Sequence, residues 1–196
     1  GEAPAAFGGT ALVFVGGLVA YLVLAAVDAY LARRSDRARS SGTAGAAGAA
    51  YLALLVAIGI GLHNLGEGLA IGSAYASGAL ALGAFLVVGF AIHNTTEGLA
   101  IVAPLREDRP GPGRLLGLGL IAGAPAILGA WIGAAAFNPS LAALLFGVGV
   151  GAIARVIVQL SPAMRDAEGR FLYPTTVLGM LAGIAVLYLT GFLVSV

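Results

Sequence analysis

The sequence predicts an all-α bundle of transmembrane helices, because three of its properties fit no soluble fold. Of its 196 residues, 60% are hydrophobic and only 10% are charged, against about 25% in an average soluble domain. The mean hydropathy is +1.00, and so short a soluble chain has too little polar surface to cover that much apolar surface. The apolar residues also gather in long segments. These properties exclude a soluble enzyme, and a net charge of +1 gives no electrostatic footprint for nucleic acid.

The length of the apolar segments predicts the number of spans. A helix needs about 20 apolar residues to cross a hydrocarbon core of about 30 Å. Transmembrane strands would show alternating segments of about ten residues, a pattern that the sequence lacks. We predict one transmembrane domain over residues 1–196, with spans at about 8–32, 48–77, 80–105, 114–137, 140–163 and 172–196 and a cytoplasmic linker at 33–47.

The first three spans are bounded by a charged linker and an uncharged turn. The span at 8–32 ends where Arg33 begins a run of Arg and Asp residues, which a stretch of small residues follows. Only a short uncharged turn separates 48–77 from 80–105. These two helices are therefore expected to be antiparallel neighbours.

The last three spans follow the same pattern. A charged loop at 106–114 precedes the span at 114–137, and an uncharged Asn-Pro-Ser connection leads into 140–163. A second charged loop at 165–170 precedes the span at 172–196. Every flanking Arg thus falls on one side, which the positive-inside rule makes cytoplasmic. With six spans, both termini are expected to lie outside.

Two neighbouring spans repeat one motif. Residues 63–71 read His-Asn-Leu-Gly-Glu-Gly-Leu-Ala-Ile and residues 93–101 read His-Asn-Thr-Thr-Glu-Gly-Leu-Ala-Ile, so seven of nine positions agree. The motifs hold the only His of the chain and the only acidic residues deep in a span. A His and a Glu four residues apart lie on one helix face, about one turn apart. Six groups are therefore expected to converge near the bilayer midplane: His63, Asn64, Glu67, His93, Asn94 and Glu97.

The duplicated motif favours a metal site. Ionisable groups at the membrane centre cost about 2.5–3.5 kcal/mol each on insertion scales, so two carboxylates there need an opposing charge. A divalent cation supplies it, and imidazole with carboxylate suits Zn²⁺, Fe²⁺, Mn²⁺, Co²⁺ or Cd²⁺. The chain has no Cys, which disfavours Cu(I). One such His/Glu pair can equally be an internal hydrogen bond, but two copies at matching depth favour the metal.

Both motifs resemble the paired metal-binding helices of the ZIP (Zrt/Irt-like) divalent-metal transporters, and most closely the GufA-like bacterial branch. Segments 122–130 and 151–162 resemble later helices of that family. The resemblance implies a ZIP-like fold in a bacterial inner membrane, with Zn²⁺ moving toward the cytoplasm. A homodimer like that of the family is a further expectation. The resemblance also implies that His63, Glu67, His93 and Glu97 coordinate the ion while Asn64 and Asn94 supply oxygen ligands or hydrogen bonds.

The chain departs from the family pattern at several positions. Six spans correspond to family helices three to eight, so the first two are expected to be missing. Ala126-Ile127 stands where the family usually has Glu-Pro, and Gln159 where it often has Glu. Gly66 and Thr96 stand where many relatives have a helix-bending Pro. These departures favour a site for a single metal ion.

Arg155 lies about two turns before the cytoplasmic end of its span, four residues before Gln159. In one interpretation it reaches the membrane interface or pairs with Asp28. In the other, its fixed charge occupies the space of a second metal and neutralises Glu67 or Glu97. Arg155 and Gln159 are therefore secondary candidates for the pathway or its modulation.

Three functions follow from these observations, with transport of a divalent metal first. A metal-binding relative that does not transport is the second. The third is an intramembrane metallohydrolase with a Glu as general base, although the sequence has no His-Glu-x-x-His motif. The expected partners are the metal ion and membrane lipid, not nucleic acid, and we do not expect an enzyme.

Overall fold

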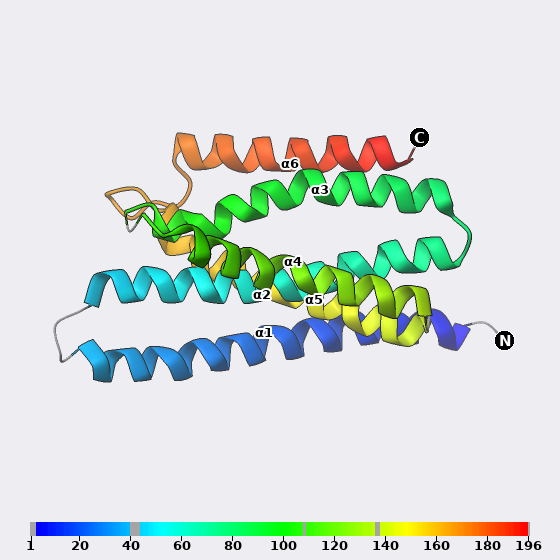
Figure 1. Cartoon of the computed structure of the whole chain (residues 1–196), viewed down its shortest axis with the longest axis horizontal. Helices are drawn as coiled ribbons and strands as arrows, with labels where there is room; N and C mark the ends of the chain where they lie inside the picture. Colours follow the sequence, from blue (N-terminus) through cyan, green and yellow to red (C-terminus); the bar gives the residue numbers. More distant parts are fainter. Residues whose placement is uncertain (1–2, 40–43, 108, 136–137, 196) are drawn as a thin grey trace.

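The computed structural model describes residues 3–39, 44–107, 109–135 and 138–195, and every regular element in these ranges is helical. The helices lie side by side along one direction (Figure 1). This confirms the predicted all-α fold. The elements are α1 (Ala3–Arg39), α2 (Ala44–Ala76), α3 (Leu80–Val102), α4 (Pro112–Ala135), α5 (Pro139–Leu160) and α6 (Pro174–Ser195), with the 3₁₀ turns η1 (Ala103–Leu105) and η2 (Ser161–Met164).

Five helices are long and apolar enough to cross a membrane. In α6, the described residues provide a shorter apolar stretch, Pro174–Leu189, so the span at 172–196 stays a prediction. Within the expected linker at 33–47, α1 continues to Arg39 and α2 begins at Ala44; residues 40–43 between them lie outside the described residues. The five candidate spans are Gly9–Tyr30, Gly48–Ala76, Leu80–Leu105, Pro112–Ala135 and Pro139–Leu160.

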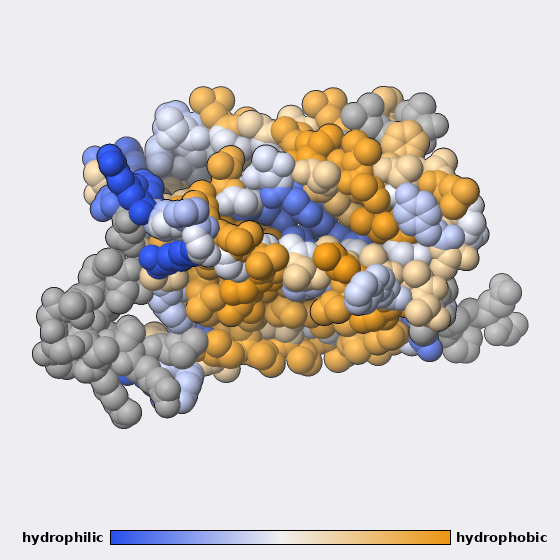
Figure 2. Space-filling view, in the orientation of Figure 1, coloured by the Kyte–Doolittle hydropathy of each residue, from blue (hydrophilic) through white to orange (hydrophobic). Residues whose placement is uncertain are grey.

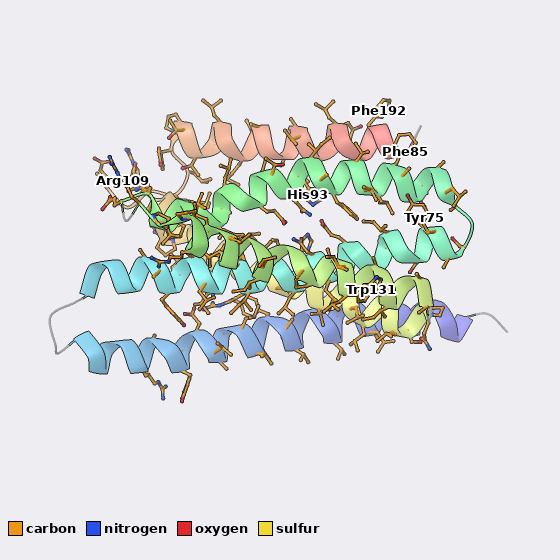
Figure 3. All side chains as sticks on the ribbon, viewed as in Figure 1. Tyr75, Phe85, His93, Arg109, Trp131 and Phe192 are labelled. Carbon is orange, nitrogen blue, oxygen red and sulfur yellow. The ribbon has the colours of Figure 1, made fainter. Side chains whose placement is uncertain are left out.

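The charged loops gather at one end of the bundle. The α3–α4 and α5–α6 loops lie at the end away from the two chain termini (Figure 1). Hydrophilic surface marks this end, whereas apolar surface covers most of the length (Figure 2). Arg109 lies at this end, while Tyr75 and Trp131 lie exposed toward the other (Figure 3), as aromatic residues do at membrane interfaces. Among the described residues, the charged loops therefore lie at one end and the α2–α3 turn at the other end carries no charge.

Glycines bring two pairs of helices into backbone contact. A Cβ added to Gly68 of α2 would collide with the carbonyl oxygen of Ala126 on α4. Gly147 of α5 meets the carbonyl oxygen of Val13 on α1 in the same way. Lipid tails are as apolar as the side chains, so helices in a bilayer associate through such close van der Waals packing. The α2–α4 seam holds the first motif in place.

The helix with the second motif is packed more loosely. In the apolar window of α2, 44% of the residues are buried, but in that of α3 only 6% are. α3 packs against α2, while α6 lies along its other side (Figure 1). The first motif thus lies on a central helix and the second on a peripheral one.

Candidate metal centre

Both motifs lie within unbroken helices, the second in the C-terminal half of its helix. His63 and Glu67 belong to α2, whereas His93 and Glu97 belong to α3. Neither helix is interrupted at its motif. Figure 3 shows His93 about halfway along the molecule. The short turn between α2 and α3 therefore sets the two motifs at matching depth, as the sequence predicts.

Glu67 is at the centre of the cluster. Its Oε1 lies 2.5 Å from His93 Nε2 and 3.4 Å from His63 Nε2. Its Oε2 accepts a hydrogen bond from Asn94 Nδ2 at 3.2 Å. The side chain is buried, with 7% of its surface exposed. One carboxylate thus joins both motifs.

The cluster has the dimensions of a metal site. One ligand atom from each of His63, Glu67 and His93 lies within 4.8 Å of the others. Ligands bound to a tetrahedral Zn²⁺ at 2.0–2.2 Å are about 3.4 Å apart. The spacing of His63 and Glu67 already matches, whereas the short contact between Glu67 and His93 must lengthen by about 1 Å. An ion bound by all three side chains would replace the hydrogen bond between Glu67 and His93.

Glu97 stands at the edge of the cluster. Its Oε1 lies 3.8 Å from His63 Nε2, which is beyond the distance of a hydrogen bond. Its Oε2 is buried without a hydrogen-bond partner. Of the four expected ligands, the structure brings His63, Glu67 and His93 together and leaves Glu97 beside them.

The two Asn residues have different neighbours. Asn64 is buried and its Nδ2 donates to the carbonyl oxygen of Ala122 on α4 at 3.1 Å, whereas Asn94 donates to Glu67. In both residues the amide oxygen is buried without a partner among the described residues. A buried polar atom with no partner costs about 1–3 kcal/mol. These oxygens, like Glu97 Oε2, need a group that the described chain does not supply.

Arg155 belongs to a second polar cluster. Its Nη2 donates to Asp28 Oδ2 on α1, which agrees with the interpretation that pairs Arg155 with Asp28. The guanidinium carbon also lies 5.8 Å from the centre of the Tyr21 ring. On the α2 side, Tyr51 Oη donates to Asp28 Oδ1 at 3.5 Å. Asp28 therefore balances the charge of Arg155 and links three helices.

This pairing bears on the other interpretation of Arg155. The groups beside Glu67 are the two His and Asn94, and no ion pair joins Arg155 to either Glu of the motifs among the described residues. Gln159 lies one turn further along α5, and its Oε1 is buried without a partner in the described part of the chain. Gln159 keeps its place as a secondary candidate.

The sequence did not reveal the contribution of α6. A cavity of about 190 Å³ lies between α3 and α6, and its lining combines His93, Thr96 and Glu97 with Gly183, Val186 and Leu187. The α6 residues are small or aliphatic and carry no motif, so no sequence signal distinguishes them from lipid-facing residues. The role of Tyr21 beside Arg155 was missed for the same reason.

The fold and the site together define the class of protein. It is an all-helical chain with helices that can span a membrane and a His/Glu/His group that can hold a metal ion. Comparison with known proteins finds no matching family model, curated protein or solved structure. The particular function is therefore argued from the site.

Proposed function

We propose that this protein transports a divalent transition-metal ion, Zn²⁺ first, across a membrane and toward the end that carries the basic loops. The observation that carries the proposal is the buried group of His63, Glu67 and His93 in the middle of two apolar helices. A carboxylate at that depth is costly unless an opposite charge accompanies it. A bound divalent ion supplies that charge.

The arrangement of the helices supports a ZIP-like transporter. The two motifs lie on adjacent antiparallel helices, and the charged loops share one end of the bundle (Figure 1). The positive-inside rule makes that end cytoplasmic. We propose that α6 is the sixth span, which places both termini on the outer side of a bacterial inner membrane.

The unpartnered oxygens support passage of an ion rather than a permanent structural site. They belong to Asn64, Asn94 and Glu97, which flank the His/Glu/His group. Carboxylate and amide oxygens can take the place of water as ligands of a divalent ion. An ion that moves a few ångströms past Glu67 therefore exchanges one set of ligands for another and is not held so firmly that it cannot leave.

Binding of the metal ion is coupled to the protonation of its ligands. A metal binds the deprotonated carboxylate and the neutral imidazole. Glu67 Oε1 and His93 Nε2 lie 2.5 Å apart, within hydrogen-bond distance, and such a bond needs a proton on one of the two atoms. Binding displaces that proton, so we expect Zn²⁺ to be bound less tightly as the solution becomes more acidic.

Uptake into liposomes tests the proposal. We expect saturable uptake of Zn²⁺ and Cd²⁺ by the purified chain, and its loss in Glu67→Ala and His93→Ala. The matched control is Glu168→Ala, which removes an exposed carboxylate from the α5–α6 loop. Metal that binds through Glu67 without any flux would instead identify a non-transporting metal-binding protein.

A further inference from the structure

The cavity between α3 and α6 lies directly beside the candidate metal centre. Its α3 wall contains His93 of the cluster and Glu97 at the cluster's edge. This wall is the side of α3 that faces α6. The contact between Glu67 and His93 lies on the side of α3 that faces α2. The cavity and the metal centre therefore share one wall.

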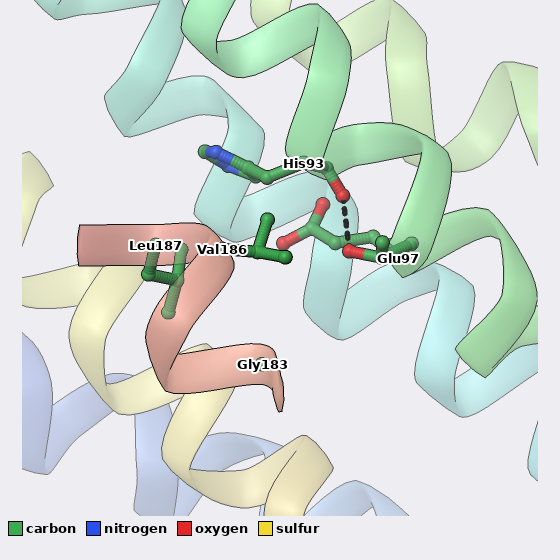
Figure 4. Close-up of a pocket in the computed structure, with 6 residues that line it drawn as sticks. His93, Glu97, Gly183, Val186 and Leu187 are labelled. Carbon is green, nitrogen blue, oxygen red and sulfur yellow. Dashed lines mark hydrogen bonds between the residues drawn. The ribbon is translucent and has the colours of Figure 1, made fainter. Parts of the chain in front are cut away.

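The two walls of the cavity differ in chemistry. In Figure 4 the carboxylate of Glu97 points across the cavity toward Val186. The hydroxyl of Thr96 is already engaged, since its Oγ1 donates to the carbonyl oxygen of His93 at 2.6 Å. The side chains of the α6 wall are aliphatic or absent. A guest in the cavity thus meets one strong charged ligand, Glu97, on one side only.

Gly183 leaves the space open. A Cβ built at Gly183 meets no atom within 4 Å, whereas one at Gly68 collides with α4. Gly183 is therefore not needed for close helix packing here. A larger residue at this position would extend into the cavity.

The cavity has room for water molecules. The cavity volume is about 190 Å³. On the same measure of volume, one water molecule needs about 10–15 Å³. The side chains of the α6 wall are aliphatic or absent, so the side-chain ligands that the cavity offers to an ion come from α3.

We propose that this cavity is the vestibule in which a hydrated divalent cation first meets Glu97 before it enters the centre at His63, Glu67 and His93. The inference rests on the proposed function. It accounts for the position of Glu97, which lines the cavity and whose Oε1 lies 3.8 Å from His63, too far for a hydrogen bond. Glu97 is then the ligand of the entering ion, whereas Glu67 is the ligand of the bound one.

A leucine at position 183 tests the vestibule. With Gly183→Leu, we expect the association rate of Zn²⁺ with the purified chain to fall about tenfold, and the dissociation rate to fall equally, because a filled vestibule obstructs both directions. The equilibrium affinity is then unchanged. Uptake into liposomes should fall with the association rate.

Gly179→Leu is the matched control. Gly179 lies one turn earlier on α6, does not line the cavity, and also has no atom within 4 Å of an added Cβ. We expect its rates to equal those of the parent chain. Equal rates in Gly183→Leu and the parent would overturn the vestibule.

A cysteine variant covers the case in which leucine disturbs the fold. The chain has no cysteine of its own, so Gly183→Cys can be modified after folding with a methanethiosulfonate reagent. We expect modification to slow Zn²⁺ association, while modified Gly179→Cys behaves as before. Unchanged association after complete modification of Gly183→Cys would reject the vestibule. A parent chain that neither binds nor transports Zn²⁺ would instead reject the proposed function.

Discussion

At the scale of single residues, the same side chain occupies different environments in the two copies of the motif. Glu67 is surrounded by both His and Asn94. Glu97 lies beside Asn64, 3.8 Å from His63, and has an unpartnered oxygen. The difference arises because α2 is central and packed on several helices, whereas α3 is peripheral. The repeat in the sequence therefore does not imply two equivalent ligands.

This asymmetry predicts unequal effects of neutralising the two carboxylates. We expect Glu67→Gln to weaken equilibrium binding of Zn²⁺ about 100-fold, or about 2.7 kcal/mol, because it removes the charge that contacts both His. Glu97→Gln should weaken it less than about tenfold. Competition with a fluorescent chelator measures both affinities. Equal losses would show that Glu97 is a full ligand of the bound ion.

At the scale of helices, the Arg155–Asp28 pair holds α5 and α1 together. The two side chains are mostly buried, with exposures of 15% and 23%. Removing one partner of a buried ion pair leaves an uncompensated charge and costs about 3–5 kcal/mol. The pair therefore acts on stability, at a distance from the metal ligands.

We expect Arg155→Gln to lower the midpoint of thermal unfolding in detergent without changing Zn²⁺ affinity. The double variant Asp28→Asn/Arg155→Gln should be more stable than either single variant, since neither charge is then left alone. Circular dichroism measures the midpoints. A change in metal affinity in Arg155→Gln would revive a direct action of Arg155 on the motif Glu residues.

The α2–α4 seam leads to another prediction about elements. A Cβ at Gly129 would collide with the carbonyl oxygen of Leu65, inside the first motif. We expect Gly129→Leu to destabilise the fold by about 1–3 kcal/mol and to weaken Zn²⁺ binding, because α2 must shift.

Gly123→Leu is its control on the same helix, since an added Cβ there meets no atom within 4 Å. Unfolding in denaturing detergent and Zn²⁺ titration measure the two effects. If both leucine variants behave alike, the contact at Gly129 does not position the motif.

At the scale of the whole molecule, the distribution of charge defines a direction. The basic loops lie at one end and the uncharged α2–α3 turn at the other (Figure 1). The positive-inside rule orients such a bundle in the membrane. Topology can be read with single cysteines, because the chain has none.

We expect Ser77→Cys, in the α2–α3 turn, to react with an impermeant maleimide in intact cells. Glu168→Cys, in the α5–α6 loop, should react only after the cells are permeabilised. Both positions are exposed, so solvent access alone does not separate them. The reverse pattern of labelling would invert the proposed orientation and the direction of transport.

The sequence by itself determined the helical fold, five of the six expected spans and the matching depth of the motifs. These follow from local properties: the length of apolar segments, the four-residue spacing on a helix, and a turn too short for anything but antiparallel neighbours. The third expected span illustrates this, since the expected 80–105 agrees with the candidate span Leu80–Leu105, which comprises α3 and η1.

Only the tertiary structure decided which motif residues meet and what surrounds them. Glu97 at the edge, Asn64 bonded to α4, Arg155 paired with Asp28 and the space beside Gly183 depend on the rotation and packing of helices distant in sequence. A helical repeat specifies which side chains share a face, but not the direction in which that face points. That direction is set by contacts such as those at Gly68 and Gly129, where the backbones of α2 and α4 meet.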